Sequence, residues 1–309
     1  AVLGKNLPMV YEQAFYEVVK TVEGQEAYFS DKTARNEIFY RTAKGAFKAG
    51  QYKTAEKYAS RVDTSSAHGP SAQYVVAISQ YGAKEKIQAR ATLEKLAATI
   101  ETSDDSMLKG LVAIDLARMN FTAHKYELSL PLYLKIPKDH PLWVSALVEQ
   151  GWAQLATEDF SGAIGNMYSL HSPYFKVLYQ PQSFVVRTVG YLNICQYGDA
   201  YKTMSKLEVD YRDWQSKLST YVKAKHSPYE TVKTYLRSKS STDVEGLPYQ
   251  IVREAARVKE FLNIQNAINQ KSDELGQFSG VNAKLLKEKE NVRVRAAEAK
   301  KRADVLELK

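Results

Sequence analysis

The chain has 309 residues, a formal net charge of +8 at pH 7 and 44% hydrophobic residues. This apolar content suffices for a continuous core, and no apolar run approaches the roughly eighteen residues that a membrane-spanning helix needs. Only nine prolines and fifteen glycines fit a mostly helical protein. The lone cysteine, Cys195, excludes an internal disulfide and a cysteine-based zinc site, and we expect it to be a buried structural thiol.

The first segment, residues 1–35, is predicted to be a capping helix. Val10, Ala14 and Val18 fall on one side of residues 9–30, and terminal repeats of a helical array need such a cover. The chain begins with Ala1 instead of methionine, which fits processing or trimming. Removal of a signal peptide is one explanation, and it favours a periplasmic or cell-envelope location over a cytoplasmic one.

The middle of the chain repeats an aromatic residue followed three positions later by a small one. An imperfect copy at Gln88/Ala91 fills a gap in the series, and the steps between the small residues are then 36, 38, 34 and 37. Such a period predicts a solenoid of helical hairpins, because the small residue lets two helices cross closely. The four complete pairs are Tyr52/Ala55, Tyr126/Ser129, Phe160/Ala163 and Tyr197/Ala200.

Further positions recur in register with the small residue. Four residues after it come Ala59, Lys95, Tyr133, Met167 and Met204. Seven residues after it come Val62, Ala98, Ile136, Leu170 and Leu207. These positions fall on single helical faces, as paired amphipathic helices require. The alternative is an unrelated helical bundle with coincidental spacing, and the joint register of several positions argues against it.

This pattern resembles the tetratricopeptide repeat over residues 36–210. The best match is 146–172, where Gly151, Trp152, Phe160 and Ala163 fit the family's register. The resemblance implies an all-α fold, an α-solenoid of about five helical hairpins. More narrowly, Leu134-Lys-Ile-Pro through Asp159–Ala163 and then Ser172–Phe175 are similar to cell-envelope repeat proteins of gliding and predatory Gram-negative bacteria.

The resemblance also implies a concave groove lined by the first helix of each repeat. That groove would be basic at its N-terminal end and apolar at its C-terminal end, which suits an acidic peptide or a free C-terminus. The alternative is that the lysines are solvated and that the aromatic residues belong to the core. The predicted groove residues are Tyr40, Lys44, Phe47 and Lys48, then Val76, Gln80 and Lys84, then Ile114, Arg118 and Phe121, then Val148, Trp152 and Leu155, then Val185, Val189 and Asn193.

Beyond the repeats, residues 211–242 are predicted to form additional helices and a linker. One helix covers 210–222, a short one follows Pro228, and the serine-rich stretch 237–246 is the linker. Residues 243–309 predict a long helical hairpin with its turn at Gly276–Gly280, or a coiled-coil-like extension. Leu285 and Val292 recur at seven residues, but Glu288 occupies the intervening seam position, so the coiled-coil pattern is weak. Self-association through these helices, or docking on a partner, stays open.

Residues that carry chemistry are scattered. There is no P-loop, no glycine-rich dinucleotide motif and no H-E-x-x-H, and we find no nucleophile with a base partner. We therefore expect no catalytic residue, no metal, no small-molecule cofactor and no enzyme activity. Most of the histidines fall at or near proposed turns, where we expect them to be solvated. They are His68, His124, His140, His171 and His226.

The predicted function is a non-enzymatic adaptor that binds a peptide or protein partner within a multiprotein assembly. If the narrower resemblance holds, the setting is a cell-envelope or motility machine, with membrane association only through a partner. The alternatives are a basic protein that associates with nucleic acid or peptidoglycan, and a self-assembling structural component. Nucleic acid is not favoured, because the recurring aromatic residues are used in helix packing and no known binding motif occurs.

Overall fold

The computed structural model describes residues 31–175, 180–238, 242–256, 275–276, 279–280 and 282–298. The chain divides into two compact units, Ala1–Asp213 and Trp214–Lys309. In the described ranges the regular structure is helical, apart from one isolated antiparallel bridge between Val244 and Leu247. The predicted all-α class is therefore confirmed. The predicted capping helix over 9–30 lies outside the described residues.

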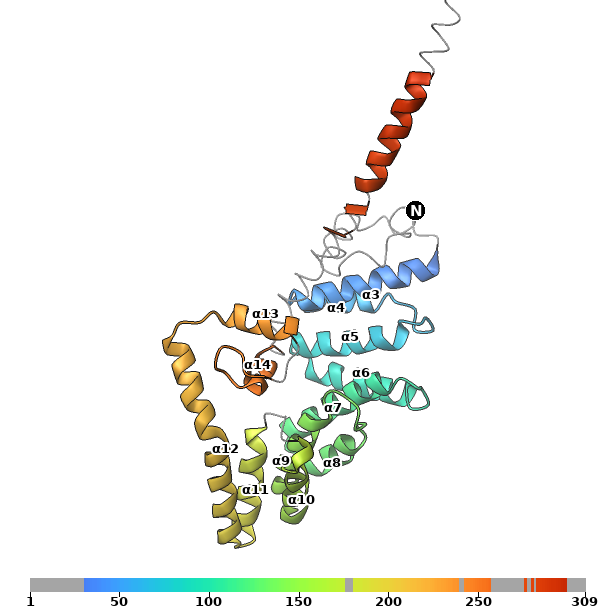
Figure 1. Ribbon diagram of the computed structural model, residues 1–309. Helices are drawn as coiled ribbons and strands as arrows, with labels where there is room; N and C mark the ends of the chain where they lie inside the picture. The colour runs from blue at the N-terminus through green and yellow to red at the C-terminus, as the bar shows by residue number, and fades with distance from the viewer. Residues whose placement is uncertain are drawn as a thin grey trace, which may run out of the picture. The chain divides into compact units, whose positions relative to one another are not determined.

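The first unit is a series of helical hairpins in chain order (Figure 1). From α3 to α11 each helix packs against the next, and the first helices of repeats one and two also touch, as do those of repeats four and five. This stacking makes an α-solenoid of five hairpins. The hairpins are α3 (Lys32–Lys48) with α4 (Tyr52–Ala59), α5 (Gly69–Gly82) with α6 (Lys86–Thr99), α7 (Ser106–Thr122) with α8 (Tyr126–Leu134), α9 (Trp143–Ala156) with α10 (Phe160–Leu170), and α11 (Pro181–Asn193) with α12 (Tyr197–Lys223).

Side-chain caps fix where several of these helices begin. The carboxylate of Asp31 accepts from the backbone N–H of Thr33 at 2.9 Å, and Asp105 and Asp159 do the same at the starts of α7 and α10. Each cap satisfies a backbone donor that the first turn leaves without a partner. Pro70 and Pro181 occupy the first turns of α5 and α11, where the missing N–H is not needed.

All five hairpins turn through the same backbone conformation. One residue in each turn has a positive φ, from 57° to 75°, and the next residue donates its N–H to a carbonyl five positions earlier. In the first turn the residue with positive φ is Gly50, and the N–H of Gln51 donates to the carbonyl of Ala46 at 2.9 Å. This is a Schellman motif, which closes the C-terminus of the first helix. The turn residues are Gly50, Lys84, His124, Glu158 and Cys195.

The small residue of each repeat is buried, and the structure corrects the register of repeat two. Ala89 is fully buried, whereas Ala91 is exposed, so the pair is Lys86/Ala89 and not Gln88/Ala91. Leu93 and Leu96 then replace Lys95 and Ala98 in the series. The small residues are Ala55, Ala89, Ser129, Ala163 and Ala200, all at most 4% exposed, with steps of 34, 40, 34 and 37 residues.

The irregular step explains the error. Lys86 stands where the other repeats have an aromatic residue, so the aromatic that marks the start of the other second helices is missing from α6. The step from repeat two to repeat three is also six residues longer than the one before. Part of this length is in α7, which has 17 residues where α5 has 14. Among the successive pairs from α3 to α11, α6 and α7 pack most sparsely.

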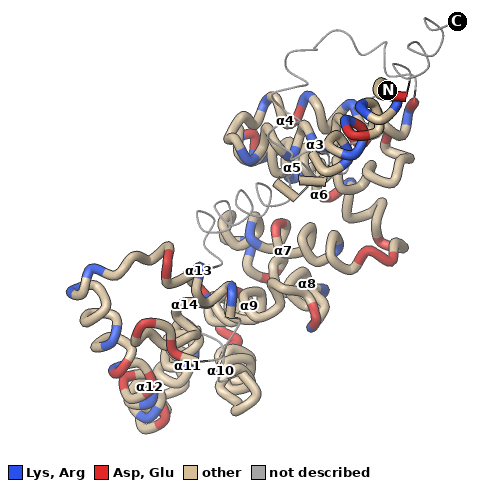
Figure 2. The backbone as a smooth tube through the Cα atoms, turned by 45° about the horizontal axis from the view of Figure 1, so that its top comes forward, with Lys and Arg blue, Asp and Glu red and all other residues tan. Residues whose placement is uncertain are grey.

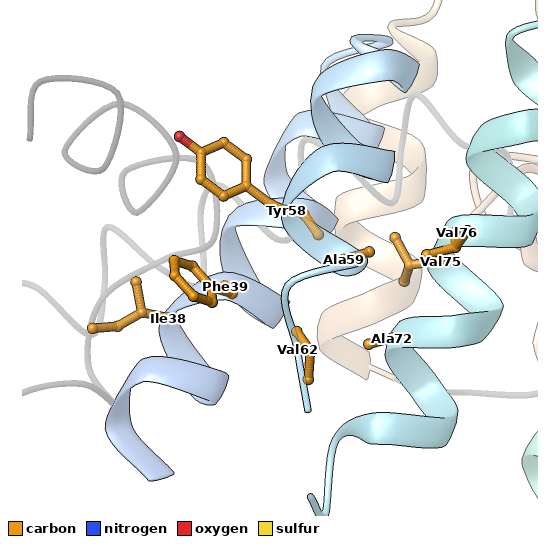
Figure 3. Packing of buried hydrophobic residues seen from close by; sticks show 9 residues of the cluster. Ile38, Phe39, Tyr58, Ala59, Val62, Ala72, Val75 and Val76 are labelled. Atoms are coloured by element: carbon orange, nitrogen blue, oxygen red, sulfur yellow. The ribbon is translucent and has the colours of Figure 1, made fainter. Parts of the chain in front are cut away.

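The core forms where one hairpin meets the next. Between repeats one and two, Ala59 faces Val75, and Val62 faces Ala72 (Figure 3). Phe39 packs against the ring of Tyr58, with centroids 6.2 Å apart. Equivalent clusters join the later repeats, so each repeat is stabilised mainly by its neighbours.

The second unit has its own small core. The end of α12, α13 (Pro228–Ser238) and α14 (Tyr249–Ala255) enclose Tyr221, Val232 and Val252. Val244 and Leu247 are buried in the same cluster, whereas the other described residues of the predicted linker are exposed. The predicted separate helix over 210–222 is instead the continuation of α12. Residues 282–298 are helical and exposed, and most of the predicted long helix after Ala256 lies outside the described residues.

Candidate binding groove on the first helices

A cavity of about 290 Å³ opens on the first helices of repeats one to three. Its walls are mostly aliphatic and aromatic, with two lysines on one side and one carboxylate on the other. The lining residues come from α3, α5 and the start of α7: Tyr40, Lys44, Phe47, Lys48, Ser71, Tyr74, Val75, Ile78, Asp105, Met107, Leu108 and Leu111.

The α3 wall consists of the four residues predicted for repeat one. The ring of Tyr40 stacks on His68 at 4.9 Å, and the Nζ of Lys44 lies 5.4 Å from the Tyr40 ring centre. His68 in turn pairs with Glu37. Phe47 packs against Tyr52, which begins α4, at 5.6 Å. The α3 wall is therefore held by one contact inside its own hairpin, from Phe47 to Tyr52, and by His68 at the start of α5.

The α5 wall follows from the corrected register. Tyr74 and Ile78 stand fifteen and eleven residues before Ala89, as Tyr40 and Lys44 stand before Ala55. Sequence reasoning missed both because it placed repeat two at Ala91. The signal that could have found them is the apolar pair Leu93 and Leu96, which fits the repeat only in the corrected register.

On the α7 wall, Met107 is 47% exposed, and Leu108 and Leu111 lie beside it in the lining. Asp105 lines the cavity too, but one of its carboxylate oxygens accepts from the N–H of Leu108 at 2.9 Å as the α7 cap. The lining thus combines aliphatic and aromatic side chains with two lysines and one carboxylate.

Next to the cavity, polar side chains link the first helices of repeats two, three and four. Tyr74 donates to Asp115 at 2.7 Å, and Arg118 donates to both oxygens of Glu149, at 2.7 and 3.0 Å. Burial raises the pKa of the Asp115 carboxyl, although the Tyr74 hydroxyl and Arg118 act in the opposite direction. The tyrosine hydroxyl of Tyr133 also donates to Glu149, at 3.3 Å. The cluster places the charged side chains Asp115, Arg118 and Glu149 in repeats three and four, towards the end of the array where the predicted groove is apolar.

Several predicted groove residues do not line the cavity. Gln80 donates to Glu56 and accepts from Thr92, so it bridges α4 and α6. Lys84 forms the turn between α5 and α6. Val76, Ile114 and Val148 are buried in the core.

The remaining predicted residues also lie outside the cavity lining. Phe121 packs edge-on against Tyr126 at 5.1 Å, closing the third hairpin, and Trp152 packs against the repeat-four core. Asn193 is exposed at the end of α11 and donates to the carbonyl of Val189 at 2.8 Å. Leu155 packs beside Trp152, while Val185 is 39% exposed.

His140, His171 and Cys195 depart from expectation, whereas His124 and His226 are exposed as predicted. His140 is buried, and its ring lies so close to Gly110 that a Cβ there would meet it at 2.6 Å. His171 is half-buried, and burial together with Arg187 lowers its pKa to about 4. Cys195 is exposed in a turn and not buried, because the first helix of repeat five ends before it. The sequence places most of the histidines at or near turns, but their burial depends on contacts from other repeats.

Charge is distributed in small pairs. Figure 2 shows basic and acidic positions alternating along the helices. Arg90 with Glu94 at 2.8 Å and Lys206 with Asp210 at 2.9 Å are examples, each spaced one helical turn apart. In the part of the chain that the structure describes, no group of acidic, histidine and cysteine side chains is arranged to hold a metal. Within the same ranges no helix is long and apolar enough to cross a bilayer.

Comparison with known proteins gives fold neighbours only. No family model and no curated protein matches the chain. Similar solved structures include a MamA mutant, with 20% identity, a TM-score of 0.46, and 57% of this chain and 92% of that chain covered. MamA from Desulfovibrio magneticus RS-1 has 12% identity and a TM-score of 0.47, with coverage of 58% and 96%. A kinesin light chain-type protein of Podosopora anserina with nearly identical TPR-like repeats has 14% identity and a TM-score of 0.47, with coverage of 60% and 99%.

Proposed function

We propose that the chain is a non-enzymatic interaction scaffold whose cavity on α3, α5 and α7 receives an apolar side chain of a peptide or protein partner. The observation that carries this proposal is the apolar cavity on the first helices of three adjacent repeats. Side chains in two of its walls are held by contacts with other residues, Tyr40 by His68 and Tyr74 by Asp115, so a partner would meet a formed surface. Pre-formed sites lose less conformational entropy on binding.

The size and charge of the cavity support a peptide segment as its occupant. At about 290 Å³ it falls just below the range of about 300–1,000 Å³ that is usual for small-molecule sites, and one or two side chains would fill it. Lys44 and Lys48 stand on the α3 side, where a partner carboxylate would gain a charged hydrogen bond. The favoured partner is therefore an acidic segment with an apolar anchor. A cell-envelope or motility setting stays a proposal from the sequence resemblance.

The first test blocks the cavity with a matched control. Ile78→Arg places a charge in the cavity wall, whereas Ile87→Arg places the same charge on α6, where Ile87 is 84% exposed. Affinity capture from the native organism, quantified by mass spectrometry, should lose a protein with Ile78→Arg and keep it with Ile87→Arg. Equal retention by both variants, with both folded by circular dichroism, would contradict the proposal.

The second test concerns the partner's charge. Reversal of Lys44 and Lys48 to glutamate should weaken capture of that same protein at least tenfold while thermal unfolding stays within a few degrees of wild type. If the bound material is instead nucleic acid or cell-wall polymer, and its retention falls steeply with salt, the basic-surface alternative is correct.

A further inference from the structure

A guanidinium without a counter-ion lies between α10 and α11. Arg187, half-buried on α11, donates from Nη1 to Nδ1 of His171 at 3.0 Å and from Nη2 to the hydroxyl of Tyr191 at 3.1 Å. Its guanidinium carbon is 4.5 Å from the ring centre of Tyr168 and 5.3 Å from that of Tyr191. None of these partners is an acid, and no ion pair to Arg187 forms among the described residues.

Hydrogen-bond geometry keeps His171 neutral. Arginine can only donate, so Nδ1 of His171 must be the acceptor and its ring proton must be on Nε2. Nε2 lies 2.8 Å from the hydroxyl of Ser183, which itself donates to the carbonyl of Gln180 at 2.5 Å. Each of these hydrogen bonds ends on a neutral acceptor, so none of them compensates the positive charge of Arg187.

The fold does not require arginine at this position. Thirteen residues before the buried small residue, repeats one to four carry neutral side chains, all buried: Thr42, Val76, Leu116 and Gln150. Repeat five alone has a charge there, and its Nε is buried without a hydrogen-bond partner. Buried charges are normally paired, and replacing one by an apolar residue of similar volume is often neutral or stabilising. The rings of Tyr168 and Tyr191 lie against the guanidinium, but among the described residues no acidic side chain pairs with its charge.

We propose that Arg187 is the centre of an oxyanion site that takes a carboxylate or a phosphate group. Nη1 and Nη2 each have one N–H beyond those used for His171 and Tyr191, and guanidinium N–H groups bind the oxygens of such a group well. The Tyr168 ring, which lies over the guanidinium, is itself 63% exposed, and Arg187 is half-buried. Nearby Lys206 is already neutralised by Asp210 at 2.9 Å. This site is independent of the cavity in repeats one to three.

The test uses the full chain with inorganic phosphate and, separately, sodium acetate, each against sodium chloride at equal ionic strength. At least one of the two anions should raise the melting temperature of the wild type saturably. Arg187→Met should abolish that rise, and Arg187→Lys should weaken the affinity at least tenfold, because lysine lacks the planar fork. Arg118→Met, which removes a guanidinium that already has Glu149 as partner, should keep the rise in full.

A nuclear magnetic resonance titration covers the case in which Arg187→Met does not fold. In the wild type, the Nε–H signal of Arg187 should shift with the effective anion and with the same affinity. A response to acetate alone would assign a carboxylate ligand, and one to phosphate alone would assign a phosphate ligand. No shift with either anion, or an equal rise in melting temperature in wild type and Arg187→Met, would overturn the proposal.

Discussion

At the scale of single residues, the hairpin turns show where the chain is locally strained. Four of the five turn residues with positive φ are not glycine: Lys84, His124, Glu158 and Cys195. A side chain in this conformation costs about 1–2 kcal/mol, because its Cβ approaches the following carbonyl oxygen. The Schellman hydrogen bonds and the packing of the two helices hold these turns in place despite that cost.

Replacing Glu158 by glycine should therefore stabilise the protein. The side chain of Glu158 is exposed, so its removal loses no packing, and we expect a gain of about 1 kcal/mol in the free energy of unfolding. Urea unfolding followed by circular dichroism measures this. Gly50→Ala, at the equivalent turn with φ 75°, is the reverse substitution and should lose a similar amount. A destabilised Glu158→Gly protein would contradict this account.

The half-buried His171 makes stability depend on pH. Its folded pKa of about 4 lies below the ordinary value of 6.5, so the unfolded chain binds its proton first as the pH falls. The contribution of His171 is complete above pH 6.5, and it declines between pH 6.5 and 4 by about 1–2 kcal/mol, allowing for solvent screening. Melting temperatures measured across this range should show the decline. The decline should be smaller in His171→Gln, whose amide oxygen can still accept from Arg187. A pH profile identical to that of the wild type would show that His171 is not its cause.

At the scale of helices, two glycines inside helices should respond to alanine in opposite ways. A Cβ at Gly110 of α7 would meet the ring of buried His140 at 2.6 Å, and that ring is held by the N–H of Leu142. A Cβ at Gly165 of α10 would meet nothing within 4 Å. Gly110→Ala should cost about 1–3 kcal/mol through overpacking, and Gly165→Ala should gain about 1 kcal/mol through helix propensity. Chemical denaturation of the two variants measures these changes in the free energy of unfolding. Changes of the same sign in both variants would contradict the prediction.

The sequence predicted features that depend on residues within one repeat, above all the positions of the second helices. Aromatic and small residues at the start of α4, α8, α10 and α12 gave the second helices, because their spacing is a property of the hairpin itself. The start of α6 was misplaced since Lys86 lacks the aromatic ring, although its Nζ still lies 6.0 Å from the ring centre of Tyr81. The break predicted at Asp210 is absent because α12 continues through that position.

The candidate site was predicted in part, for a physical reason. Tyr40, Lys44, Phe47 and Lys48 were found because they follow one helical face of repeat one. The cluster of Tyr74, Asp115, Arg118 and Glu149 joins three repeats, and no single-repeat pattern encodes which side chains meet across an interface. Gln80 shows the same limit, because its polar partners lie on α4 and α6.

At the scale of the first unit, burial decreases at the last hairpin. The residue four positions after the small one is nearly inaccessible in repeats one to four, whereas Met204 of repeat five is 42% exposed. Stability in such arrays comes from neighbouring repeats, so the last hairpin lacks one stabilising interface. Hydrogen exchange should therefore be faster for amides of 200–210 in α12 than for those of α6 and α8. Slower exchange in α12 would show that another surface covers it.

The sparse packing between α6 and α7 has a mechanical consequence. The cavity on α3, α5 and α7 lies across the same junction, so an occupant would touch both sides of it. Under tension applied along the array, this junction should rupture at the lowest force. A partner bound to both α5 and α7 should raise that force. The array would then resist a higher tension when the cavity is occupied.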